Sequence, residues 1–209
     1  MLAKFLWPRQ IMAEKDFYVV GIGISAGGQD PLLALISLLP PNLNASFVIL
    51  PHLSRDHKSY LHNIIRKVAR MPVIRVEQRE LLRPGVIYVL PENKMMFMEQ
   101  GFLVLRERKS EEKMNYAINV FFMSLAREAG EKAIGVILSG ANDDGLLGAN
   151  EINYHGGIIL VQDALTAVFP RMPLEIINKD HPIEIKPPEE LAQSLIRRTS
   201  GSDSHTKQQ

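Results

Sequence analysis

Three loops of the sequence carry side chains that together could perform acyl transfer. Ser25, His52 and the pair Asp143 and Asp144 each come directly after an apolar run or within a few residues of its end. A serine needs a base to become a nucleophile near neutral pH, and the base needs a carboxylate that fixes its tautomer. Ser25, His52 and one of the aspartates could supply these three groups.

Each of these residues also has an ordinary structural interpretation. Ser25 could cap a helix N-terminus, His52 could be a hydrogen-bonded loop histidine, and Asp143 and Asp144 could be turn residues before Gly145. A position of Ser25 at a helix N-terminus would also favour catalysis, because free backbone N–H groups there can hold an oxyanion. The convergence of the three groups at strand ends favours the catalytic interpretation.

The glycines around Ser25 fit two other patterns. The segment Gly21-Ile-Gly-Ile-Ser-Ala26 is a variant of the dinucleotide fingerprint, but His52 stands where the acidic ribose-binding residue is expected. Gly23 to Gly27 matches the nucleophile elbow of α/β-hydrolases, with Asp163 and His181 available to complete a triad. That fold places several strands before its nucleophile, whereas Ser25 follows the first predicted strand.

The sequence predicts neither a cofactor nor a metal site. His52, His57 and His62 are spaced by five residues, so they do not share a helical face as a metal-binding pair would. The chain has no cysteine, which excludes disulfides, thiolate metal sites and thiol catalysis. We therefore expect the chemistry to depend on groups of the protein itself, with no cofactor or metal.

The elements that must position these loops alternate between strands and helices. Apolar runs predict strands at 17–24, 46–50, 73–76, 133–138 and 157–161, and helical periodicity predicts helices at 32–39, 61–68, 120–126, 146–154 and 189–197. The short segments 85–90, 94–98 and 102–105 are typical of antiparallel hairpins. The expected fold is α/β, a doubly wound, mostly parallel sheet with helices on both faces and an antiparallel hairpin insertion. Ligands bind such a sheet outside the carboxyl ends of its strands.

The composition limits the class of protein. The 209 residues are 46% hydrophobic and 22% charged, and the formal net charge is +1, so we expect a folded protein that binds no nucleic acid. No apolar window is long enough for a membrane span or a secretory signal, so no membrane insertion is expected and the cytoplasm is the expected location. We expect a leader at 1–16, one catalytic domain at 17–198 and a disordered polar tail at 199–209.

At this point the loops resemble those of one family, the chemotaxis-type protein-glutamate methylesterases, along most of the chain from Val19 to Arg197. The segment 21–28 (GIGISAGG) is similar to the serine loop of that family, 51–53 (PHL) to its histidine loop, and 138–145 (LSGANDDG) to its aspartate loop. Further segments at 83–91, 157–163 and 169–173 follow in the same order as in the family. The resemblance implies a serine esterase that hydrolyses glutamyl methyl esters on the cytoplasmic domain of a methylated chemoreceptor, and the same acyl chemistry would allow glutamine deamidation.

The resemblance also assigns roles to residues. It implies a triad of Ser25, His52 and Asp144, with Asp143 at a variable position, and an oxyanion hole from the backbone N–H groups of Ala26 and Ala141. Two stretches depart from the family. Residues 114–119 (MNYAIN) replace a His-Arg-Pro-Ser-Val-Asp stretch, and Arg171 stands where glycine is usual.

Regulation is the property on which the sequence departs most from the family. Its common architecture places a phosphorylatable receiver domain before the esterase, and only about 16 residues precede the first predicted strand here. We therefore expect constitutive activity, with a separate response regulator as the partner if control acts in trans. The alternative function is a non-catalytic binding or scaffold module of the same fold in a signalling system.

Overall fold

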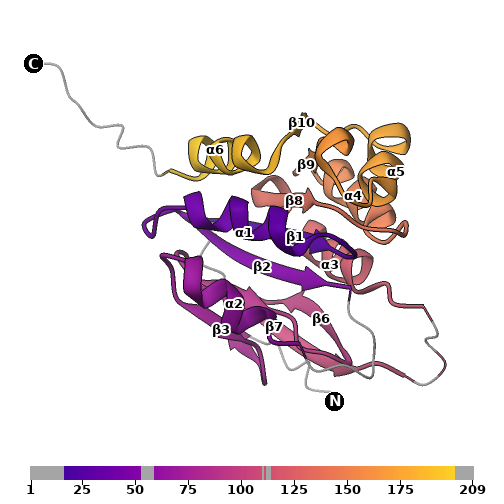
Figure 1. Ribbon diagram of the computed structural model, residues 1–209. Helices are drawn as coiled ribbons and strands as arrows, with labels where there is room; N and C mark the ends of the chain where they lie inside the picture. The colour runs from indigo at the N-terminus through magenta and orange to yellow at the C-terminus, as the bar shows by residue number, and fades with distance from the viewer. Residues whose placement is uncertain (1–16, 53–58, 110, 112–113, 201–209) are drawn as a thin grey trace, which may run out of the picture.

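A seven-stranded parallel sheet forms the centre of the molecule (Figure 1). The computed structural model describes residues 17–52, 59–109, 111 and 114–200. The strand order is β10-β9-β8-β1-β2-β5-β3. The strands are β1 (Tyr18–Ile24), β2 (Ala45–Pro51), β3 (Val73–Arg75), β5 (Ile87–Val89), β8 (Ala133–Ile137), β9 (Ile158–Gln162) and β10 (Glu184–Lys186). The order reverses between β1 and β8, which is where doubly wound folds place their ligands.

Two hydrophobic cores fill the space on either side of this sheet. One contains the apolar faces of α1 (Gln29–Leu38), α2 (Leu61–Val68) and α6 (Pro188–Thr199). The other contains those of α3 (Ala117–Ala129), α4 (Leu146–Tyr154) and α5 (Arg171–Lys179). The expected doubly wound arrangement, with helices on both faces, is confirmed. Within the described residues, no helix is long and apolar enough to cross a membrane.

A second, antiparallel sheet packs on the α3 side of the molecule. It has the order β4-β7-β6, with β4 (Glu80–Leu81), β6 (Lys94–Glu99) and β7 (Phe102–Glu107). The predicted hairpin of 94–98 with 102–105 is present in β6 and β7. The prediction for 85–90 is wrong, because β5 pairs in parallel with both β2 and β3. Its three core residues are buried on both faces of the sheet, and a short apolar run does not reveal the direction of pairing.

Two elements near the C-terminus were not predicted. The helix α5 begins at Arg171 and contains Pro173. The first turn of a helix tolerates proline because residues there donate no hydrogen bond within the helix. The strand β10 lies at the sheet edge and alternates charged and apolar residues over only three positions. At the other boundary, Thr199 is a buried residue of α6 and not part of a tail. The predicted leader 1–16 and the rest of the tail from 201 lie outside the described residues.

The glycines of β1 are explained by packing against α3. A Cβ atom on Gly21 would lie 2.8 Å from the Phe122 ring, and one on Gly23 would lie 2.8 Å from Ile118. Glycine therefore lets α3 approach the central strand directly. This packing accounts for two glycines of the dinucleotide-like pattern without a nucleotide.

Candidate active site

The register of the central strands brings Ser25 and His52 together. β1 lies between β2 and β8, and its last residue Ile24 pairs with Pro51 of β2. The amide of His52 donates to the carbonyl oxygen of Ile24 at 2.8 Å, and the amide of Ser25 donates to that of Ser139 at 3.0 Å. The serine therefore leaves the sheet flanked by the histidine loop on one side and the aspartate loop on the other.

A tight turn directs the Ser25 hydroxyl toward His52. The amide of Gly28 closes the turn on the Ser25 carbonyl at 3.0 Å, and Gly27 has a φ of 67°, a conformation that favours glycine. α1 begins only at Gln29, with Gly28 as its N-cap. Ser25 is therefore not the cap of this helix. Its Oγ atom lies 3.4 Å from Nδ1 of His52.

The partners of the His52 ring define its tautomer. Nε2 lies 2.8 Å from the carbonyl oxygen of Asn115, which can only accept, so Nε2 carries the proton. The Asn142 side chain is oriented by the amide of Asp144, which donates to its Oδ1 at 3.2 Å. Its Nδ2 then donates to Nδ1 of His52 at 3.1 Å. Nδ1 is therefore unprotonated and faces Ser25 as a base.

The surroundings of His52 also favour its neutral form. Burial lowers the pKa of the imidazole below its ordinary value, and the nearby charge of Arg108 acts in the same direction. The hydrogen bond to Asn115 partly opposes this shift. The ring is thus poised to accept a proton near neutral pH.

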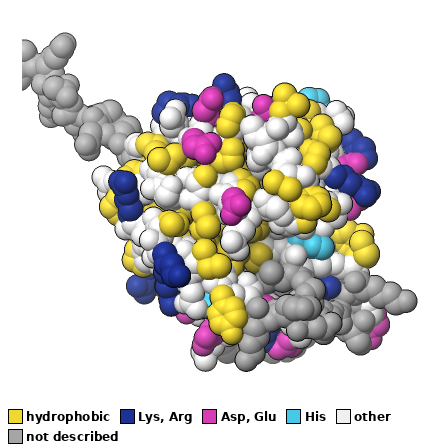
Figure 2. Space-filling model, in the orientation of Figure 1, with side chains coloured by type: hydrophobic (Ala, Val, Ile, Leu, Met, Phe, Trp, Pro, Cys, Tyr) yellow, Lys and Arg dark blue, Asp and Glu magenta, His cyan; other side chains and the backbone are white. Residues whose placement is uncertain are grey.

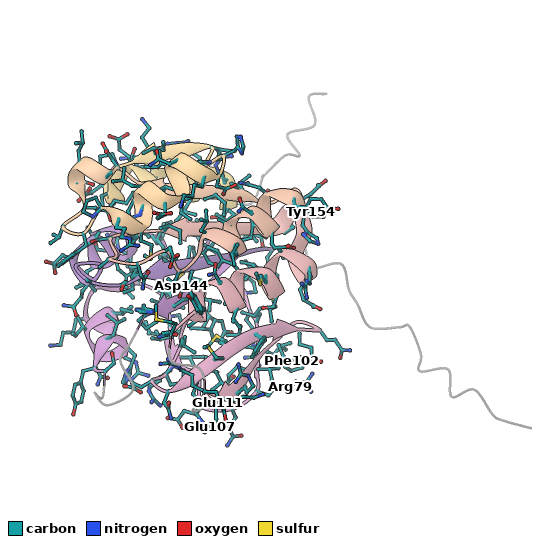
Figure 3. All side chains as sticks on the ribbon, turned by 90° about the vertical axis from the view of Figure 1, so that its right-hand side faces the viewer. Arg79, Phe102, Glu107, Glu111, Asp144 and Tyr154 are labelled. Atoms are coloured by element: carbon teal, nitrogen blue, oxygen red, sulfur yellow. The ribbon has the colours of Figure 1, made fainter. Side chains whose placement is uncertain are left out.

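Asp144 lies elsewhere than the expected triad geometry requires. Among the described residues, the ring of His52 bonds to Ser25, Asn142 and Asn115, and the expected hydrogen bond to Asp144 is not formed. Figure 3 shows Asp144 in the interior of the molecule, beside the helices on the α3 side of the sheet. Its two carboxylate oxygens accept the amides of Ile118 at 3.0 Å and Asn119 at 2.9 Å. These amides belong to the first turn of α3 and need acceptors from outside the helix.

A chain of contacts nevertheless links Asp144 to His52. Asn115 precedes α3, and its side chain accepts the amide of Ala117, the first residue of that helix. The amides of the next two residues of the same turn donate to the Asp144 carboxylate, which fixes them in place. The backbone that presents the Asn115 carbonyl to His52 is thereby held from both sides.

Burial raises the pKa of Asp144 to about 7, and the neighbouring charge of Asp143 adds to the shift. The amides of Ile118 and Asn119 act against it by favouring the carboxylate. Asp143 is itself exposed. The environments of the two neighbouring aspartates therefore differ sharply.

The two amides predicted to form an oxyanion hole are accessible. Ala26 and Ala141 are both exposed, and neither of their backbone N–H groups donates a hydrogen bond within the described part of the chain. The loops that carry them are joined by the Ser139 hydroxyl, which donates to the carbonyl oxygen of Ala26 at 2.9 Å. Among the described residues, both donors therefore remain without a protein acceptor.

The structure does not assemble the other sites considered. The carboxylate of Asp163 accepts the amide of Leu165 at the end of β9, and His181 is exposed after α5. Neither side chain joins Ser25 in a triad. No group of three or more candidate metal ligands occurs in the described residues, and His57 lies outside them.

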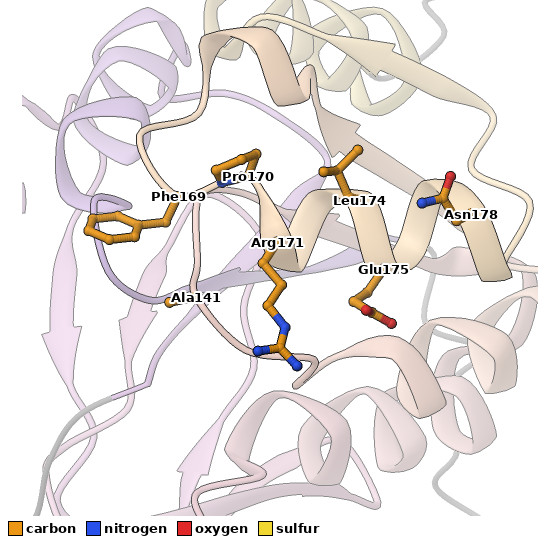
Figure 4. A pocket seen from close by; sticks show the side chains of 7 residues that line it. All are labelled: Ala141, Phe169, Pro170, Arg171, Leu174, Glu175 and Asn178. Carbon is orange, nitrogen blue, oxygen red and sulfur yellow. The ribbon is translucent and has the colours of Figure 1, made fainter.

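Two pockets flank the serine loop. One of about 140 Å³ is lined by Ser25, His52 and Leu61, among others. A larger pocket of about 520 Å³ lies beyond Ala141, against the start of α5 (Figure 4). The reactive side chains thus face a small pocket, and the predicted oxyanion loop borders a larger one.

Asn115 and Asn142 are the site residues that the sequence did not reveal. Amide side chains in loops are common turn and cap residues, so neither carried a chemical pattern. The position of Asn142 two residues before Asp144, within a loop already selected, was the only available signal.

Comparison with known proteins identifies relatives over most of the chain. The family model for CheB methylesterase matches residues 20–195. The crystal structure of the Thermotoga maritima CheB methylesterase catalytic domain superposes with a TM-score of 0.81 at 25% identity, covering 88% of this chain and 99% of that one.

Several relatives are named protein-glutamate methylesterase/protein-glutamine glutaminase. That of Moorella thermoacetica is 29% identical over 88% of this chain, and one of Syntrophus aciditrophicus is 30% identical over the same share. The chain spans about half the length of these two, 45% and 53%. A Leptospira interrogans protein, provisionally given the same name, is 29% identical, and the match covers 95% of its length.

Proposed function

Because the chain belongs to the CheB methylesterase family, we propose that it hydrolyses glutamyl methyl esters of a protein substrate and releases methanol. The observation that carries the proposal is the pairing of Ser25 with a His52 ring whose unprotonated Nδ1 faces the hydroxyl. The protein substrate is a methylated chemoreceptor, as the family and the names of the relatives support. The cytoplasmic location of the enzyme belongs to this proposal.

The reaction proceeds through an acyl-enzyme. Nδ1 of His52 takes the proton of the Ser25 hydroxyl while Oγ attacks the ester carbonyl, and the amides of Ala26 and Ala141 stabilise the oxyanion. The imidazolium then gives this proton to the departing methoxide, which leaves as methanol. In the second half, His52 takes a proton from water, the hydroxide attacks the acyl-serine, and the proton returns to Ser25 as glutamate is released.

The groups around His52 hold the ring for these proton transfers. The Asn115 carbonyl keeps the Nε2–H tautomer, the task that a carboxylate performs in the common triad. In this proposal Asp144 is the third residue of the site, and it acts on His52 indirectly. Its carboxylate caps the N-terminus of α3 and so holds the backbone that presents the Asn115 carbonyl.

The same acyl chemistry supports a second activity. An amide nitrogen can replace methoxide as the leaving group, so glutamine would be deamidated to glutamate with release of ammonia. The names of the relatives include this glutaminase activity.

A separate response regulator stays a prediction, tested by whether a phosphodonor with such a partner changes the rate.

Labelling by a serine-directed phosphonate tests the proposal against a non-catalytic scaffold. An esterase should incorporate one phosphonate on Ser25, as peptide mass spectrometry would show, and should release methanol from a methylated receptor fragment. The Ser25→Ala variant should do neither, while Ser37→Ala on α1 should match the wild type. A folded wild-type chain that shows no labelling and no methanol release would favour the scaffold function.

A further inference from the structure

The larger pocket beside the serine loop is lined by a positively charged side chain, that of Arg171, which the proposed reaction does not use. It is lined by Ala141 and by residues at the start of α5, including Phe169, Arg171, Leu174 and Glu175. Figure 4 shows the side chains of Arg171 and Glu175 extending from the same side of α5. The pocket therefore combines apolar walls with charged groups a short distance from the oxyanion loop.

Backbone contacts fix this pocket to the catalytic loops. The amide of Gly140 donates to the carbonyl oxygen of Phe169, and the amide of Met172 donates to that of Gly140, both at 2.9 Å. On the other side, a Cβ atom added to Gly27 would lie 2.9 Å from the Phe169 ring. A substrate segment that reaches Ser25 would thus pass next to the pocket.

The charges in the pocket are not equivalent. Glu175 forms an ion pair with Lys179 one turn later on α5. Arg171 is exposed and has no ion pair within the described residues. The guanidinium is therefore the charge that remains available to a ligand, and its planar set of donors suits a carboxylate.

The neighbouring surface is apolar. Val168, Phe169 and Leu174 are 72%, 43% and 40% exposed, and in Figure 2 hydrophobic side chains gather over the part of the molecule that contains α5. Exposed apolar side chains around one available cation fit a protein segment better than a small polar molecule.

From this arrangement we propose that Arg171 binds an acidic side chain of the protein substrate, one that lies near the ester and beside an apolar residue. The inference rests on the proposed function and names its sequence preference. Substrate segments that carry glutamate near the ester would bind more tightly than those that carry glutamine. Arg171 is then a specificity-determining residue outside the group of atoms that react.

Binding to the Ser25→Ala chain tests the preference without turnover. The probes are fluorescein-labelled peptides with one glutamyl methyl ester and a nearby glutamate whose spacing from the ester is varied, each paired with a peptide that has glutamine instead. Fluorescence anisotropy should give a Kd about three- to tenfold lower for at least one acidic peptide than for its partner. The ratio of the two Kd values should fall toward one in Arg171→Gln and should be kept in part in Arg171→Lys.

A matched control removes a cation elsewhere. Arg127→Gln on α3 changes the net charge equally, far along the helix from Ala117, and should keep the preference. Equal Kd values for every peptide pair, or a preference that persists in Arg171→Gln, would overturn the subsite. Phosphonate labelling of the wild-type chain reports separately on the esterase. Preferential binding of acidic peptides without labelling of Ser25 would refute the proposed function and would support the Arg171 binding site alone.

Discussion

Asp144 and Asn119 cap each other's helix. The Asp144 carboxylate, just before α4, accepts two amides of the first turn of α3, including that of Asn119. The Asn119 side chain in turn accepts the amides of Gly145 and Gly148 at the start of α4, both at 3.0 Å. One buried pair thus accepts two amides at each helix N-terminus and fixes the α3 end next to His52.

The central expectation for catalysis is non-additive loss of turnover. Ser25→Ala and His52→Ala should each reduce kcat on the order of 10⁴-fold or more, and the double variant should be little worse, because the two side chains share one proton transfer. Methanol release from a methylated receptor fragment measures this. Additive losses in the double variant would show that they act in different steps.

Asp144 and Asp143 should differ in their effect on rate. Asp144→Asn replaces one carboxylate acceptor by an amide donor facing a backbone N–H, so kcat should fall about tenfold or more as the α3 end loosens. Asp143→Asn should cost little, since that side chain is exposed. Circular dichroism at the assay temperature separates loss of rate from unfolding. Equal effects of the two changes would contradict the assignment of Asp144.

The raised pKa of Asp144 predicts a pH-dependent stability. The folded state holds this proton up to about pH 7, whereas an unfolded aspartate loses it near its ordinary value of 3.8. The resulting stabilisation is complete below the unfolded pKa and is lost as the pH rises through the folded pKa. The Tm of wild type relative to Asp144→Asn should therefore fall between about pH 4 and pH 7. A Tm difference that does not change over this range would argue against a buried, neutral Asp144.

Asn142 should set the pH at which the base becomes active. Its Nδ2–H bonds only to a neutral Nδ1 of His52, so it opposes protonation of the ring. Asn142→Ala should therefore move the acidic inflection of kcat/KM to higher pH. Asn150→Ala, an exposed change on α4, should leave the inflection in place. A shift to lower pH in Asn142→Ala would show that Asn142 is not the donor in this contact.

The close approach of α3 to β1 should make Gly23 intolerant of a side chain. Gly23→Ala should destabilise the protein by roughly 1–3 kcal/mol, because the new Cβ atom would overlap Ile118. Urea denaturation measures the change. Combining it with Ile118→Ala should cost less than the sum of the two single changes. Full additivity would mean that the overlap is relieved elsewhere.

The sequence by itself determined the strands that carry the reactive loops, and with them the family. The buried runs of β1, β2 and β8 are continuous and apolar, and parallel strands end at a common edge, so Ser25 and His52 could be expected to meet. The predicted helix 146–154 has the bounds of α4. The loops that carry Ser25 and His52 were identifiable because each reactive residue follows its strand directly in the sequence.

Tertiary structure decided the features that depend on partners distant in the sequence. The direction of β5 is set by β2 and β3. The first turn of α5 accommodates Pro173 because proline has no N–H and residues of a first turn donate no hydrogen bond within the helix. The carboxylate of Asp144 bonds to the α3 amides, and the Asn115 carbonyl, 63 residues from His52, fixes the imidazole tautomer. Free amides at a buried helix end need acceptors, and only packing shows which side chain supplies them.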